Sequence, residues 1–216
     1  MALTAVATSA LACGTPGPAR YDSGAAQGNA APRPAEPPAV AVRSAPSPGD
    51  RAHWRATLDW PADCEDAFQA SNAGTADEGI AVSELEPRLA LVEVLCAAGA
   101  YQPSHVYVLF DERGAVPVNT VLRFSVYHSE DGTSLGASME TELWGESFVS
   151  PQSRELSVLT LSRQLADCGI WSRYRIGTDP TLIAAAARLP CPAAPGSPAA
   201  STGGAPRGWR PIRLRR

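Results

Sequence analysis

The sequence predicts a mainly β fold: one antiparallel domain, arranged as a single sheet, a sandwich or a barrel-like structure, with disordered N- and C-terminal segments. Short segments alternate between apolar and polar residues with a period of two, turn residues separate them, and no long amphipathic helix intervenes. The segments expected to be strands are 56–60, 89–96, 105–111, 121–128, 138–144, 156–161 and 170–176. The pair 121–128 and 138–144 is expected to form a hairpin.

Composition divides the chain into four parts. Residues 1–13 resemble a lipoprotein signal, and residues 14–50 are a Pro/Ala-rich segment expected to be a disordered tether. Residues 51–192 are the predicted β domain, and residues 193–216 are a Pro/Gly-rich basic tail. Neither end offers enough apolar side chains to offset the conformational entropy lost on folding.

The charges exclude one class of partner. The predicted domain holds 10 Arg against 19 Asp and Glu, a net charge of −9, whereas the tail holds 5 Arg and no acid. An acidic body does not suit nucleic acid, so we expect no nucleic-acid partner. The tail is expected to be a short solvated terminus.

Cys13 is the expected site of lipidation. It follows a short run of small apolar residues and precedes the tether, which is typical of a bacterial lipoprotein signal. The alternative is an unmodified cysteine in an Ala-rich leader. With lipidation, the protein is anchored to a membrane of the bacterial cell envelope and faces the periplasm or the exterior. No apolar run is long enough to span a bilayer.

The other four cysteines, Cys64, Cys96, Cys168 and Cys191, all lie in the predicted domain. In a small domain outside the cytoplasm, four cysteines predict two disulfides. The residues alone leave all three connectivities open. A zinc site is the alternative, but no Cys-x-x-Cys spacing is present.

Two motifs resemble the domain-of-unknown-function 1176 (DUF1176) family of bacterial envelope proteins. Residues 159–169, which end in Asp-Cys-Gly, are similar to the C-terminal family motif together with Trp171 and the closing Cys191. Residues 91–96 and the Gly-Ala-Tyr-Gln turn at 99–102 are similar to an upstream strand, cysteine and turn of that family. The resemblance implies an envelope context, a β-rich domain and no catalytic residues.

The resemblance also bears on the disulfides and on one ambiguous segment. It favours the pairs Cys64–Cys96 and Cys168–Cys191, because each pair falls within one family motif. It favours a strand at 180–189, where Pro180 and a run of Ala are helix signals.

The turn that contains Asp167 and Gly169 is a candidate binding turn. Its structural interpretation is that Asp167 caps backbone N–H groups while Gly169 supplies a positive φ. Gln164 and Ala166 stand where the family has glycine, which changes the expected conformation of this loop.

The sequence shows no catalytic, cofactor or metal site. Residues 132–136 match the G-x-S-x-G pattern of serine hydrolases, but His53, His105 and His128 all precede Ser134, so we expect a hairpin loop there. The acidic groups around His128 and around Glu65 lack a metal-ligand spacing and are expected to be solvated turns. The aromatic residues Tyr101, Trp144 and Trp171 are expected to be core or half-buried sheet residues.

These observations predict an envelope-tethered lipoprotein that acts by binding or as a structural component and is not an enzyme. The more specific version is an inhibitor or accessory subunit of an envelope enzyme, with an envelope protein as its partner. The rival is an envelope hydrolase that uses two carboxylates. A cleft with two acids would favour the hydrolase, and a flat or aromatic-rimmed surface would favour binding.

Overall fold

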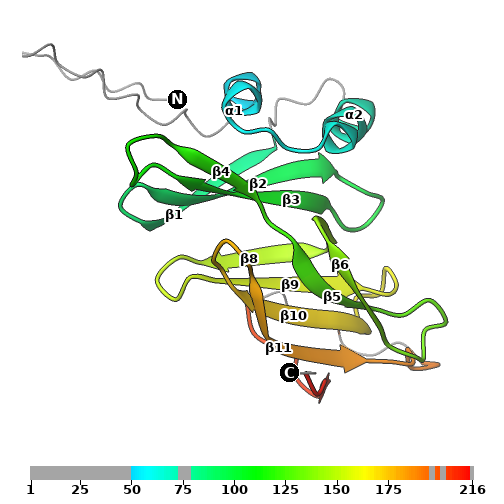
Figure 1. Ribbon diagram of the computed structural model, residues 1–216. Coiled ribbons are helices and arrows are strands. Elements are labelled where there is room, and N and C mark those ends of the chain that lie inside the picture. The colour runs from blue at the N-terminus through cyan, green and yellow to red at the C-terminus, as the bar shows by residue number, and fades with distance from the viewer. Residues whose placement is uncertain (1–49, 73–78, 195–197, 200–202, 215–216) are drawn as a thin grey trace, which may run out of the picture. The chain divides into compact units, whose positions relative to one another are not determined.

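The computed structural model describes residues 50–72, 79–194, 198–199 and 203–214, which form a mainly β structure with two short helices (Figure 1). The predicted signal, Cys13 and almost all of the predicted tether lie outside the described residues. The elements are α1 (Arg51–Thr57), α2 (Ala62–Ser71), β1 (Ile80–Glu86), β2 (Leu89–Ala97), β3 (Ser104–Asp111), β4 (Val118–Val121), β5 (Phe124–His128), β6 (Gly136–Glu140), β7 (Glu142–Trp144), β8 (Glu146–Ser150), β9 (Glu155–Leu161), β10 (Gly169–Arg175), β11 (Thr181–Arg188) and β12 (Arg210–Pro211).

The strands form three antiparallel sheets, so the expectation of a single sheet is wrong. The first sheet has the order β1-β2-β3-β4, and β7 also pairs with β3. The second sheet has the order β12-β11-β10-β9-β8, and β5 and β6 form a separate hairpin. A single sheet would leave one apolar face of β2 and β9 in water, whereas two stacked sheets bury these faces against each other.

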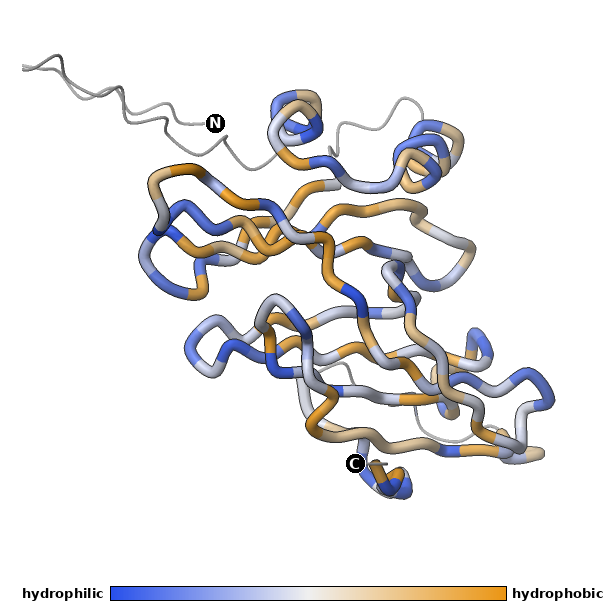
Figure 2. The backbone as a smooth tube through the Cα atoms, viewed as in Figure 1, coloured by the Kyte–Doolittle hydropathy of each residue, from blue (hydrophilic) through white to orange (hydrophobic). Residues whose placement is uncertain are grey.

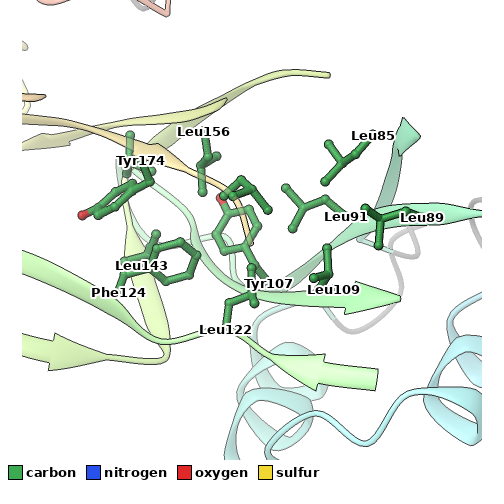
Figure 3. Close-up of a cluster of buried hydrophobic side chains, with 12 residues drawn as sticks. Leu85, Leu89, Leu91, Tyr107, Leu109, Leu122, Phe124, Leu143, Leu156 and Tyr174 are labelled. Atoms are coloured by element: carbon green, nitrogen blue, oxygen red, sulfur yellow. The ribbon is translucent and has the colours of Figure 1, made fainter. Parts of the chain in front are cut away.

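Three clusters of buried side chains join these layers. One lies between the two large sheets and includes the hairpin residue Phe124 (Figure 3). A second packs α1 and α2 against the other face of the first sheet, and a third covers the outer face of the second sheet. Figure 2 shows that hydrophobic residues gather in the strands, whereas most connecting loops are hydrophilic.

The segment 56–60, expected to be a strand, belongs instead to α1 and the turn after it. The Asp50 side chain accepts a hydrogen bond from the backbone N–H of His53 at 3.0 Å and so caps the helix. Trp54 and Leu58 are four residues apart and fully buried, which is the spacing of one helix face. The burial of Trp54 and Leu58 on one helix face outweighs the short apolar–polar alternation that predicted a strand.

The predicted hairpin is confirmed at its centre and divided at its ends. Residues 124–128 pair with 136–140, which begins two residues before the expected partner segment 138–144, and 118–121 and 142–144 pair with β3 in the first sheet. The chain therefore leaves the first sheet before Phe124 and returns after Glu140. The hairpin lies against the second sheet in between, where it contacts β10 and β11.

The strand expected at 180–189 is confirmed as β11, which pairs with β10. The expectation of a disordered C-terminal segment is wrong for residues 203–214. Arg210–Pro211 adds β12 beside β11, and Ile212 donates a backbone hydrogen bond to Ala185 at 2.8 Å. Burial of Trp209 against the second sheet gives this Pro/Gly-rich segment the apolar contact that its composition otherwise lacks. In the described part of the chain, no helix is both long and apolar enough to cross a membrane.

Candidate ligand-binding pocket

A pocket of about 430 Å³ lies where the β5–β6 hairpin and β7 meet β9 and β10. This volume is in the range of sites that hold small molecules. Its lining residues are Val126, Tyr127, His128, Ser138, Glu140, Glu142, Leu143, Trp144, Val158, Thr160, Ser172 and Tyr174. Apolar side chains of the inter-sheet core adjoin it, and polar residues supply the rest of its lining.

On strand β6, polar side chains extend from the face of the hairpin that packs on the core, and an apolar side chain extends from the opposite face. Ser138 and Glu140 pair directly with Val126 and Phe124, so all four side chains extend from the face of the hairpin that packs on the core, although Ser138 is only half-buried and Glu140 is exposed at its edge. Met139 lies on the opposite face and is half exposed.

The hydroxyl groups in the pocket are oriented by the backbone. Thr160 Oγ1 donates to the carbonyl oxygen of Trp144 at 2.6 Å, and Tyr174 Oη donates to the carbonyl oxygen of Ser125 at 3.2 Å. Because each hydroxyl has one proton, both oxygens present only lone pairs to a ligand. Burial raises the pKa of Tyr174 to about 12, so its hydroxyl keeps that proton at neutral pH.

A polar cluster behind the pocket joins the two large sheets. Glu93 of β2 accepts a hydrogen bond from Ser147 of β8 at 2.6 Å and lies 3.2 Å from His105 Nε2 of β3. The cluster borders the pocket, since His105 pairs across the strands with Leu143, and Ser147 pairs with Val158. Both of these partners line the pocket.

Burial lowers the pKa of His105 by more than the nearby carboxylates of Glu93 and Glu142 raise it. The imidazole is therefore neutral at neutral pH and brings no positive charge to this region. Burial also raises the pKa of Tyr107, which lies beside the cluster, well above its ordinary value.

The model of the DUF1176 family, described as a protein of unknown function, matches residues 14–196. The chain belongs to the DUF1176 family. Comparisons with curated proteins and with solved structures found no match. The DUF1176 motif residues can now be located in the fold.

The DUF1176 turn after β9 is held by ionic and covalent contacts. Asp167 is fully buried, and its two oxygens accept hydrogen bonds from Nε and Nη2 of Arg163 at 2.7 and 2.5 Å. Gly169 has the expected positive φ, and a Cβ atom there would lie 2.1 Å from the carbonyl oxygen of Thr160. These contacts give Asp167 a structural partner in Arg163, which was not expected, and the capping of backbone N–H groups by Asp167 stays a prediction.

The cysteines of the DUF1176 motifs pair as the resemblance implies. Cys64 is bonded to Cys96, with Cα atoms 4.5 Å apart, and this disulfide joins α2 to β2. Cys168 is bonded to Cys191, with Cα atoms 5.2 Å apart, and joins the start of β10 to the segment after β11. Neither disulfide borders the pocket, so both support the fold that positions it.

The serine-hydrolase pattern at 132–136 lies in the loop between β5 and β6, as expected. Ser134 donates its hydroxyl hydrogen to Asp131 at 2.7 Å, and its backbone N–H donates to the same carboxylate. These bonds and the N–H of Thr133 hold the pKa of Asp131 well below its usual range. His128 lies near Ser138, with 3.4 Å between Nδ1 and Oγ, and not near Ser134.

The acidic groups considered as metal ligands are not brought together. Among the described residues, no three His, Cys, Asp or Glu side chains are close enough to hold a metal ion. Glu65 instead forms an ion pair with Arg51 at 2.8 Å and accepts a hydrogen bond from Gln69. Of the three aromatic residues considered above, Trp171 is buried and Tyr101 and Trp144 are half exposed.

Proposed function

We propose that this chain is a lipoprotein of the bacterial cell envelope that binds a small polar ligand in the pocket between the β5–β6 hairpin and the second sheet. The polarity of β6 carries the proposal, because the half-buried Ser138 and the exposed Glu140 line the pocket from the core-facing side of the hairpin, while Met139 extends from the opposite side. Apolar walls with a few convergent polar groups are typical of ligand sites. Binding is the activity that this lining supports best.

The pocket also contains two acids, which favours the rival hydrolase. Glu140 and Glu142 are separated by one residue and lie on the same chain segment, whereas β9 and β10 contribute no carboxylate to the lining. Glycoside hydrolysis uses carboxyl groups that flank the scissile bond. With both acids on one side, the arrangement favours binding over hydrolysis.

The envelope location rests on two features of the chain. Cys13 follows a signal-like segment, and the folded domain has two disulfides, which persist in oxidising compartments outside the cytoplasm. The lipid at Cys13 is proposed to hold the protein on a membrane, with residues 14–50 between the anchor and the domain.

Replacing Cys13 with Ala is expected to move the protein from the membrane fraction to the soluble fraction. Two acyl chains supply the membrane affinity, at about 0.8 kcal/mol for each buried methylene group, and the variant lacks both. Immunoblots of separated fractions and the mass of the N-terminal peptide check this. Unchanged fractionation with an unmodified peptide would remove the anchor from the account.

Filling the pocket is expected to abolish ligand binding. Ser138→Trp places a large ring on the pocket side of β6, whereas Met139→Trp places the same ring on the exposed side of the same strand. A set of amines, saccharides and carboxylic acids is tested by isothermal titration calorimetry against the full chain and both variants. We expect a fragment that binds the wild type and Met139→Trp but not Ser138→Trp. Binding that survives Ser138→Trp would place the site elsewhere.

A further inference from the structure

The side chains with a fixed charge that line the pocket are both acidic, and His128 is the one basic side chain among the described lining residues. Glu140 and Glu142 are acidic, and no arginine is among the described residues that line the pocket. The chain has no lysine that could supply a positive charge instead. Phosphate or carboxylate ligands would therefore meet two carboxylates and no counter-charge.

Four polar groups of the pocket act only as hydrogen-bond acceptors, whereas Tyr127, His128, Ser138 and Trp144 also line it and can donate. Carboxylates only accept, and the hydroxyl protons of Thr160 and Tyr174 are already donated to backbone carbonyl groups. A ligand that reaches these acceptor-only groups must bring donors, and a positive charge on it complements the two carboxylates. An ammonium group brings three donors on one charged nitrogen.

The apolar side chains of the lining indicate the chemistry of the uncharged part of the ligand. Val126, Leu143 and Val158 adjoin the polar groups. These side chains match a short hydrocarbon body, and Tyr127 and Trp144 add aromatic surface to the lining. The neutral His105 beyond Leu143 does not offset the negative charge of the pocket.

Resting on the proposed binding function, we propose that the ligand is an organic amine: an ammonium group paired with Glu140 and Glu142, carried on a short aliphatic chain that packs on the apolar wall. Glu142 is half-buried and Glu140 is exposed, so partial desolvation strengthens the pair with Glu142 more than the pair with Glu140. Residues 51–216, which include the basic segment packed on the second sheet, hold 15 Arg and 19 Asp and Glu, and this net charge of −4 would also raise the local concentration of cations.

The test uses cadaverine, its neutral analogue pentanediol, and the disaccharide chitobiose, each titrated into the full chain by calorimetry. We expect cadaverine to bind and pentanediol to bind at least about tenfold more weakly. Affinity for cadaverine should fall as salt rises from about 50 to about 500 mM, because salt screens the ion pair.

The matched variants keep the shape of the pocket and change its charge. Glu140→Gln combined with Glu142→Gln is expected to weaken cadaverine binding at least about tenfold. Glu130→Gln combined with Glu146→Gln removes two exposed charges outside the lining and is expected to change the affinity less than about twofold. Thermal unfolding of each variant checks that all of them are folded.

The remaining outcomes would overturn the inference, each for a different reason. Equal binding of cadaverine and pentanediol, or equal losses in the two double variants, would exclude the ammonium pairing and leave the pocket as a binding site. Binding of chitobiose but not cadaverine would replace the amine with a saccharide, and the proposed function would stand. If no fragment binds, and Ser138→Trp therefore changes nothing, the inference and the proposed function both fail.

Discussion

Replacing Phe124 with Ala is expected to lower the free energy of unfolding by about 3–5 kcal/mol. Phe124 is fully buried, with ring centroids 5.6 Å from Tyr107 and 5.0 Å from Tyr174, both edge-on. Tyr107 belongs to the first sheet and Tyr174 to the second, so the substitution opens a cavity where the hairpin contacts both sheets. Chemical denaturation of the wild type and the variant measures the loss.

The same substitution is expected to weaken any ligand that binds in the pocket, because Phe124 holds the β5–β6 hairpin that forms one wall. Met139→Ala is the control: it lies on the same hairpin but faces solvent, and we expect its effect to stay within about 0.5 kcal/mol. A loss below about 1 kcal/mol for Phe124→Ala would show that the hairpin is not anchored through this ring.

Removing the disulfide between Cys64 and Cys96 is expected to cost about 3–4 kcal/mol. The bond closes a loop with a sequence separation of 32, and restricting a loop of this length in the unfolded chain gives that magnitude on the chain-entropy model. The double variant Cys64→Ala with Cys96→Ala is compared with the wild type by chemical denaturation under non-reducing conditions. The bond also fixes α2 on the first sheet, so local unfolding is expected to begin there.

Cys13→Ala is the matched control for this experiment, since it removes a cysteine outside the described domain and is expected to leave the unfolding free energy unchanged. Equal stabilities for the wild type and the double variant would mean that the bond contributes nothing to the fold. Four titratable thiols in folded wild-type protein would contradict the disulfides themselves.

The sequence predicted the two disulfides of the domain and most of the strands. Alternation and turn residues located β2, β3, β9 and β10, and the family motifs paired the cysteines correctly. For β11, the resemblance outweighed local helix signals correctly, because pairing with β10 decides the conformation of this segment. These features depend on short-range pattern or on the spacing of a motif.

Two predictions about local structure were wrong, the strand at 56–60 and the disorder of residues 203–214. Each of these segments is held by a single apolar residue whose partners are distant in sequence. Trp54 is buried against the first sheet and Trp209 against the second, and neither contact is visible in local composition. The isolated Trp209, with Ile212 and Leu214 near it, was a signal that part of the Pro/Gly-rich tail has an apolar surface to cover.

The pocket could not be predicted because its residues come from five strands. The alternation of Ser138 and Glu140 with Met139 was visible, but the usual rule assigns the apolar residue to the interior. Only the register of β6 against β5 shows that the polar face points inward. Polarity reversed in this way is a local conflict of the kind expected at a functional site.

The most direct test of the account is where a bound fragment contacts the protein. Backbone amide resonances of the isotope-labelled full chain are assigned, and the set of amines, saccharides and carboxylic acids is added. We expect the shifts caused by a binding fragment to centre on Val126, Ser138 and Thr160 and to disappear in Ser138→Trp. Shifts centred outside the pocket, or no shifts with any fragment, would contradict the claim that this pocket is the functional site.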